Sequence, residues 1–201
     1  HGGQLIDVYK IYLQTHEDEL YDMLMLHNRE DLEGMPLILP ILNYPDFFEH
    51  PFLLKNETVL DDRVILQLEN PVFLPVSCAC RTELGSFSAD GQKAVLEIPL
   101  YRGVLKHFYE NYKDYYYLIY EDTAVHKSIG EFVEKSARRK ATAKTCYTKK
   151  EGSFFPLADV WDRPMFQEEY HGKLLFGEYT DGIFECPEFL EKYIKKIAFA
   201  K

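Results

Sequence analysis

The stretch RVILQLENPVFLPVSCACRTELGSFSADGQKAVLEIPLY, residues 63–101, decides the fold of this chain. Apolar and polar side chains alternate along most of it, and a period of two is typical of strands that bury one face. The pair Asp90-Gly91 stands between two alternating runs, which is a strong hairpin signal. The pattern predicts strands over 64–69, 73–82, 84–88 and 93–101, with turns at Ala89-Asp90-Gly91 and Arg102-Gly103.

The sequence that follows continues this pattern. Thr123 is a candidate N-cap for a helix over 124–139, whose apolar face holds Ile129, Phe132 and Val133. Pro187 suits the first turn of a closing helix over 187–198. Further strands are expected over 104–106, 115–119 and 173–179, and an extended, exposed segment over 142–150. Strands in series without regular crossover helices predict an antiparallel α+β domain over 57–201.

Upstream of residue 57 the period is helical instead. Apolar residues recur every three to four positions over 4–13 and again over 16–42, with Thr15 as the expected N-cap of the second helix. Pro36 and Pro40 are expected to bend or shorten its last turns. The segment 43–56 has turn chemistry and no regular period, so it is interpreted as a packed linker. The expected division is therefore a helical segment over 1–45 and the antiparallel domain over 57–201.

Charge and cysteine content exclude several classes. The net charge of −10 argues against a protein whose whole surface coats nucleic acid. Four cysteines are too sparse for a secreted disulfide framework, so reduced thiols are expected; a zinc site that uses Cys78, Cys80 and a distant His is the weaker alternative. No apolar run approaches about 20 residues, and no signal peptide is evident. We expect a cytoplasmic protein without membrane contact.

The segment with most chemical information is His27-Asn28-Arg29-Glu30-Asp31 on the second helix. His27 and Asp31 are four residues apart and therefore share one helix face. A metal-dependent nuclease needs carboxylates at its metal ions and a neighbouring group that orients the attacking water. On spacing alone, the pattern favours a His and an Asp at the edge of an amphipathic helix, because this spacing is a common accident.

Longer strings around this pair carry a family resemblance. The segments GGQLIDVY (2–9), LMLHNREDLEGM (24–35), KDYYYL (113–118), EDTAVHKS (121–128) and ATAKTCYT (141–148) resemble the C-terminal part of a bacterial family of predicted ribonuclease-H-like 3′–5′ exonucleases. These belong to the DEDD nuclease superfamily. The resemblance implies that Asp31 matches the last metal-ligand Asp and that His27 stands where many members have Tyr. It also implies a divalent ion, Mg²⁺ or Mn²⁺, for the full-length protein and no cofactor for this chain.

This sequence departs from the superfamily pattern in one respect. The Asp-x-Glu motif and the middle Asp of the superfamily precede the last motif, but only 30 residues precede Asp31 here. The chain also begins in mid-structure, at His1-Gly2-Gly3. We therefore expect a C-terminal piece that is inactive alone and whose partner is its own upstream catalytic domain. Catalytic residues are limited to His27 and Asp31, as the remnant of an incomplete site.

A basic segment over 135–150 is the candidate for nucleic-acid binding. These 16 residues contain no acid and carry +7, which leaves −17 for the rest of the chain. Cations with nearby aromatics suit the backbone and bases of single-stranded DNA or RNA. The alternative is a solvated surface that balances nearby acids, in a structural or protein-interaction domain that docks the catalytic domain. The predicted contacts are Lys135, Arg138, Arg139, Lys140, Lys144, Tyr147, Lys149 and Lys150, with Phe154 as a second stacking ring.

The aromatic run over 109–120 and the nearby His126 leave two interpretations open. The tyrosines are expected to form core and sheet surface, with an aromatic ligand cradle as the alternative. His126 follows Glu121 and Asp122; it is interpreted as structural, with a general base as the alternative.

Overall fold

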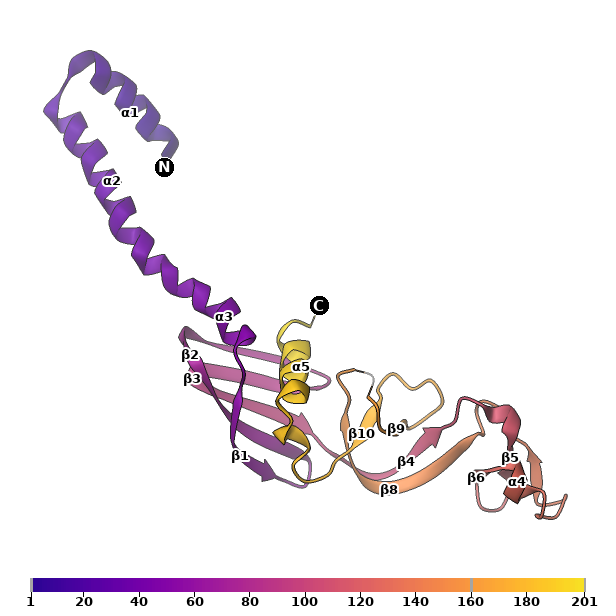
Figure 1. The fold of residues 1–201 in the computed structure, drawn as a ribbon. Coiled ribbons are helices and arrows are strands. Elements are labelled where there is room, and N and C mark those ends of the chain that lie inside the picture. Colours follow the sequence, from indigo (N-terminus) through magenta and orange to yellow (C-terminus); the bar gives the residue numbers. More distant parts are fainter. Residues whose placement is uncertain (1, 160, 201) are drawn as a thin grey trace.

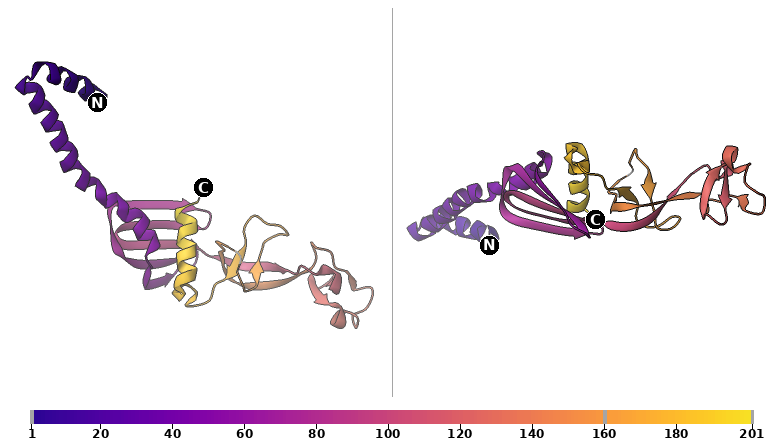
Figure 2. Two further views of the ribbon diagram at one scale, coloured as in Figure 1. Left: turned by 45° about the horizontal axis from the view of Figure 1, so that its top comes forward. Right: turned by 90° about the horizontal axis from the view of Figure 1, so that it is seen from below.

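The computed structural model describes residues 2–159 and 161–200 of an elongated molecule. A helical arm (residues 2–42) projects from one end of a central sheet (residues 53–99). A two-stranded ladder (residues 101–108 and 147–156) leads from the other end of the sheet to a small distal lobe (residues 109–146) (Figure 1). Figure 2 shows the same order of parts from two further directions. The predicted α+β class, with N-terminal helices followed by antiparallel sheets, is confirmed.

The helical arm consists of α1 (Gly2–Thr15), α2 (Asp18–Ile38) and the 3-10 turn η1 (Leu39–Leu42). The two predicted helices are present, but the predicted cap is wrong. The Thr15 hydroxyl donates to the carbonyl of Ile11 at 3.1 Å, so it belongs to the end of α1. Glu17 occupies the N-cap position of α2 without a side-chain cap. The helix continues through Pro36, and the backbone then tightens into η1.

The predicted linker over 43–56 is wrong. It folds as helix α3 (Asn43–Glu49) and the start of strand β1 (Leu53–Val59). Phe47 and Phe52 are buried, and the Asn70 amide ties the end of α3 to the sheet by donating to the Phe47 carbonyl at 2.9 Å. Apolar side chains without a regular period therefore become ordered here through tertiary contacts that the local pattern does not reveal.

The central sheet has the order β1-β2-β3, with β2 over Arg63–Thr82 and β3 over Gly85–Pro99, all antiparallel. The predicted hairpin at Asp90-Gly91 is wrong, because the chain reverses between Thr82 and Gly85 instead. Gly91 lies inside β3, opposite Leu74 at a break in register. Its φ of +58° and the Phe73 ring, 3.1 Å from where a Cβ would stand, explain why glycine occupies this bulge.

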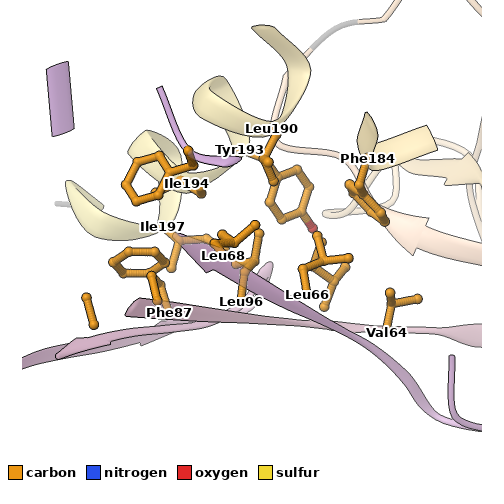
Figure 3. Packing of buried hydrophobic residues seen from close by; sticks show 14 of the residues in the cluster. Val64, Leu66, Leu68, Phe87, Leu96, Phe184, Leu190, Tyr193, Ile194 and Ile197 are labelled. Carbon is orange, nitrogen blue, oxygen red and sulfur yellow. The ribbon is translucent and has the colours of Figure 1, made fainter. Parts of the chain in front are cut away.

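One face of the sheet is covered by α5 (Pro187–Ala198), which has the predicted bounds with proline at its first turn. Figure 3 shows side chains of α5 lying over Leu66, Leu68 and Leu96 of the strands. The Tyr193 hydroxyl is buried and donates to the carbonyls of Leu84 and Pro156. The residues of α5 that enter this core are Leu190, Tyr193, Ile194 and Ile197.

The ladder is formed by β4 (Tyr101–Phe108) and β8 (Tyr147–Pro156), and all of β4 pairs with residues 147–154 of β8. Two short strands, β10 (Phe176–Glu178) and β9 (Met165–Phe166), extend it in the order β4-β8-β10-β9. The 3-10 turn η3 (Ile183–Glu185) then leads into α5. The predicted turn at Arg102-Gly103 is wrong, since both residues are paired within β4.

The distal lobe, residues 109–146, joins the far end of the ladder. Its sheet has the order β6-β5-β7, with β5 over Tyr115–Leu118, β6 over Thr123–His126 and β7 over Arg138–Lys140. The turn η2 (Tyr112–Asp114) precedes β5, and the four-residue α4 (Lys127–Gly130) follows β6.

The predicted helix over 124–139 is wrong. Its first residues pair with β5 as a strand, and its last residues form β7 on the other side of β5. The His126 ring accepts a hydrogen bond from the Ser128 amide at 3.3 Å and so caps the short α4. This is the structural role that the sequence favoured for His126. Helical spacing of Ile129, Phe132 and Val133 was outweighed by strand pairing on both sides.

Candidate nucleic-acid interface

His27 and Asp31 lie one turn apart on α2, with His27 Nδ1 3.1 Å from Asp31 Oδ2. Both side chains are open to solvent on the helical arm. One carboxylate cannot hold a pair of divalent ions, which need several converging oxygen ligands. Among residues 2–159 and 161–200, no group of three or more His, Cys, Asp or Glu side chains is placed to bind a metal ion.

The basic segment over 135–150 spans several elements of the fold. It includes β7, the turn that follows, and the first residues of β8. Three of its cations form hydrogen bonds or ion pairs within the molecule. Arg138 donates to the Gly130 carbonyl and its guanidinium lies 4.4 Å above the Tyr116 ring. Lys149 pairs with Asp122, and Lys150 pairs with Glu178 at 2.6 Å.

Asp122 joins the distal lobe to the ladder. The hydroxyls of Tyr117 and Tyr147 both donate to Asp122 Oδ1, while the Lys149 ammonium contacts Oδ2. The Lys149 ammonium, with help from the two hydroxyls, holds the pKa of Asp122 far below its usual value. Burial, and then the hydrogen bond to Asp122, raise the pKa of Tyr147. Asp122 has φ +51°, a backbone conformation that Asp and Asn adopt more readily than most residues.

These contacts decide the role of Tyr147, which the sequence offered as a stacking ring. Tyr147 is only 7% exposed, and its ring packs against Phe108 and Tyr117. Phe154 is also buried, in the core of the ladder. Because both rings are buried, neither offers a face to a base in this conformation. A position within or after a basic run does not show whether an aromatic side chain of a strand points inward or outward.

The remaining cations of the segment are exposed. The Arg139 guanidinium lies 4.8 Å over the Tyr117 ring and stays open to solvent. Lys135, Lys140 and Lys144 are exposed, and within the described ranges 2–159 and 161–200 no acidic side chain forms an ion pair with any of them. Cations without internal partners are the ones free to meet phosphate.

Two exposed rings lie on the same lobe and were not predicted as contacts. Tyr120 is 79% exposed and Phe132 is 91% exposed, both in the turns around β5 to β7. The sequence placed Tyr120 in the aromatic run and Phe132 on the apolar face of a helix. The absence of that helix leaves Phe132 in solvent. No sequence signal marked either ring, since Tyr120 precedes Glu121 and Asp122, and Phe132 had helical spacing with Ile129 and Val133.

The four cysteines are free thiols. Cys78 and Cys80 lie half-buried on β2, and burial raises the pKa of both. Cys146 is buried in the distal lobe, where burial raises its thiol pKa to about 11. Such thiols are poor nucleophiles at neutral pH, because nucleophilic attack needs the thiolate.

Comparisons with protein-family models, with curated proteins and with solved structures found no match for this chain. No helix in the described part of the chain combines the length and the apolar character needed to cross a membrane.

Proposed function

We propose that this chain is the C-terminal accessory region of a metal-dependent 3′–5′ exonuclease and that its distal lobe holds single-stranded nucleic acid. The partner in this proposal is the protein's own upstream catalytic domain, which the sequence resemblance at 24–35 implies. A cytoplasmic location belongs to the same proposal and is supported by the four unpaired thiols.

The observation that carries the proposal is the surface of the distal lobe. Lys135, Lys140 and Lys144 are exposed cations, and Tyr120 and Phe132 are exposed rings on the same small lobe. Cations track the phosphates of a strand, while rings stack on its bases with little sequence preference. Exposed cations and exposed rings on one small lobe are the two kinds of group that a polyanion with planar bases needs. The same chemistry serves DNA and RNA.

The shape of the molecule suggests a role for nucleic-acid binding by the distal lobe. The distal lobe and the helical arm lie at opposite ends of the elongated structure (Figures 1 and 2). In the proposed nuclease, His27 and Asp31 belong to the catalytic end. The distal lobe would then hold the part of the strand that has not yet reached the site of cleavage. Such an anchor raises the residence time of substrate without contributing to the chemical step.

An oligonucleotide-binding experiment tests the proposal. Affinity for a single-stranded DNA oligonucleotide is measured by fluorescence anisotropy at several salt concentrations for the parent and for Lys135→Ala/Lys140→Ala/Lys144→Ala. The triple variant should bind more weakly. Each lost phosphate contact should flatten the slope of log affinity against log salt by about 0.7 for a single strand.

A matched control separates local contacts from net charge. Lys93→Ala/Lys192→Ala/Lys196→Ala removes three exposed lysines on β3 and α5 and changes the net charge by the same amount. This variant should bind like the parent. Absence of binding by the parent at low salt, or equal weakening by both triple variants, would overturn the proposal.

Catalysis has its own expected outcome. With Mg²⁺ or Mn²⁺ and single-stranded DNA or RNA, this chain should leave the substrate intact, because Asp31 is a single metal-ligand carboxylate. In a protein that also contains the upstream carboxylates, Asp31→Asn should abolish cleavage. Metal-dependent degradation by the pure chain that disappears in Asp31→Asn would show that the site is complete without an upstream domain.

A second candidate function is favoured by the helical arm. Within α2, all of which the structure describes, no residue is buried, and Leu32, Met35 and Leu37 are exposed. A surface of this kind is typical of a region that docks another folded domain. The alternative is therefore a purely structural element that attaches to the catalytic domain. Absence of oligonucleotide binding, together with tight association of the arm with that domain, would favour it.

A further inference from the structure

A pocket of about 490 Å³ lies where the ladder meets the distal lobe. Rings line part of it, from His107 on β4, Tyr109 just beyond β4, and Tyr115 on β5. Polar side chains line another part. They are Glu110, Asn111 and Gln167. The volume lies in the range of about 300–1,000 Å³ that is typical of small-ligand sites.

The rings form a continuous aromatic row. Tyr109 and Tyr115 stack with centroids 4.8 Å apart and planes 15° apart. His107 packs perpendicular to Tyr109, with centroids 5.0 Å apart, and His126 packs perpendicular to Tyr115, with centroids 5.6 Å apart. A planar heterocycle that enters the pocket can extend such a row by offset stacking.

The polar groups at the pocket are rich in acceptors. His107 Nδ1 lies 2.8 Å from the Met165 carbonyl, which can only accept, so Nδ1 carries the proton and Nε2 of the neutral ring is an acceptor. Asn111 uses its amide NH₂ on Asp114, which leaves its amide oxygen as an acceptor. Glu110 is an exposed carboxylate. These acceptors suit a ring that carries an amino group and would repel a phosphate.

The basic segment is attached to both stacked tyrosines. The Tyr109 amide donates to the Cys146 carbonyl at 2.9 Å, and the Ala141 amide donates to the Tyr115 carbonyl at 3.1 Å. The backbone between these two contacts carries Lys144, and Lys140 directly precedes it. The segment that carries both cations is therefore joined to the aromatic row through its backbone, while Glu110 and Asn111 line the pocket.

We infer that this pocket binds one nucleobase of a single strand, with preference for a base that bears an amino group. The base stacks on the Tyr109–Tyr115 row, its amino group donates to the acceptors, and Lys140 and Lys144 bind neighbouring phosphates. This inference rests on the proposed function and adds the subsite that recognises the base.

The test compares a base-bearing strand with an abasic one. Affinities of a single-stranded oligodeoxycytidylate and of an abasic deoxyribose-phosphate strand of equal length are measured for the parent, Tyr109→Leu and Tyr109→Phe. The parent should prefer the base-bearing strand by roughly 5- to 100-fold. Tyr109→Leu should lose most of that preference and keep its affinity for the abasic strand, whereas Tyr109→Phe should retain the preference. Tyr101→Leu, a tyrosine at the other end of β4, should behave like the parent.

The outcomes separate the two proposals. If the parent binds neither strand, the proposed function and the subsite fail together. If the parent binds both strands but Tyr109→Leu keeps the full preference for bases, the subsite fails and the phosphate contacts stand. Glu110→Gln gives a further reading, because it should lower the ratio of affinities for oligodeoxycytidylate and oligothymidylate.

Photocrosslinking of the parent protein tests the inference without relying on variants that could fail to fold. A single-stranded oligodeoxycytidylate with one 5-iodocytosine is irradiated in the complex, and the modified peptide is identified by mass spectrometry. The crosslink should fall on Tyr109 or Tyr115. Crosslinks confined to peptides outside the pocket would overturn the inference.

Discussion

The central sheet and the helical arm contain similar apolar side chains but use them in opposite ways. In the sheet, Leu66 and Leu96 are fully buried under α5 (Figure 3). In the arm, Leu37 is 80% exposed, and Leu26 and Met35 are also open to solvent. Since burial of apolar surface is what makes such side chains stabilising, the sheet is stabilised within this chain. The arm's apolar surface becomes stabilising only when something covers it.

The distal lobe differs from both. Its core cluster is small and contains Tyr117, Cys146 and Tyr147 rather than a layer of branched aliphatic residues. Polar contacts around Asp122 and cation–π contacts of Arg138 and Arg139 supply much of its cohesion. A region held in this way should open more easily than the sheet and should respond to pH, which the sheet core should not.

The largest effect is expected for a cavity in the sheet. Leu66→Ala should lower the free energy of unfolding by about 2–5 kcal/mol, because Leu66 has no exposed surface and its neighbours can relax only in part. Urea unfolding followed by the fluorescence of Trp161 measures this loss. Leu53→Ala, at an exposed position on β1, is the matched control and should change the free energy by about 0.5 kcal/mol or less. Equal losses in the two variants would contradict the core described for the sheet.

A smaller, pH-dependent effect is expected at Asp122. Asp122→Asn keeps a residue suited to φ +51° but removes the charge that Lys149 and the two tyrosine hydroxyls contact. It should destabilise the distal lobe by roughly 1–2 kcal/mol near pH 7, a value reduced by the partial exposure of the pair. Amide exchange of β5, corrected for intrinsic rates, measures this local stability.

The direction of the pH dependence follows from the lowered pKa of Asp122. Folding stabilises the carboxylate, so its contribution is complete above the unfolded pKa, near the ordinary value of 3.8, and is lost as the pH falls toward the folded value. The difference between the parent and Asp122→Asn should therefore be constant from pH 7 to about pH 5 and should shrink below about pH 4. A difference that grows on acidification would show that the carboxylate is not stabilised by folding.

The sequence predicted those elements whose own pattern determines them. The alternating run 63–101 indicated an antiparallel sheet, and the helix over 187–198 was predicted with its observed ends because Pro187 marks its first turn. The prediction of a helix over 124–139 was wrong because two strand pairings with β5 outweighed helical spacing. The prediction of a hairpin turn at Asp90-Gly91 was wrong because the glycine occupies a bulge against Phe73 rather than a turn.

The candidate interface was predictable only in part. The basic run located the distal lobe, but the sequence could not separate Lys135, Lys140 and Lys144 from Arg138, Lys149 and Lys150. That separation depends on partners far away in the chain, such as Glu178 for Lys150. The aromatic run over 109–120 suggested a cradle as one alternative, and only the fold brings its tyrosines together with His107 and Gln167.

The smallest effect on this chain is expected in the arm, where Leu37→Gln removes an apolar side chain that the chain itself does not bury. The free energy of unfolding should change by about 0.5 kcal/mol or less, because an exposed side chain loses little burial on substitution. Urea unfolding at two protein concentrations measures it against Leu66→Ala. A loss of several kcal/mol that is independent of concentration would show that Leu37 packs inside this chain. A loss that increases with concentration would show that a second copy covers the arm.

In a protein that includes the proposed catalytic domain, Leu37→Gln should become destabilising by about 1–3 kcal/mol, because a leucine buried at the docking surface would be replaced by a polar side chain. The comparison of sheet and arm is then sharpest, since one residue type would be stabilising in the sheet at all times and in the arm only on docking.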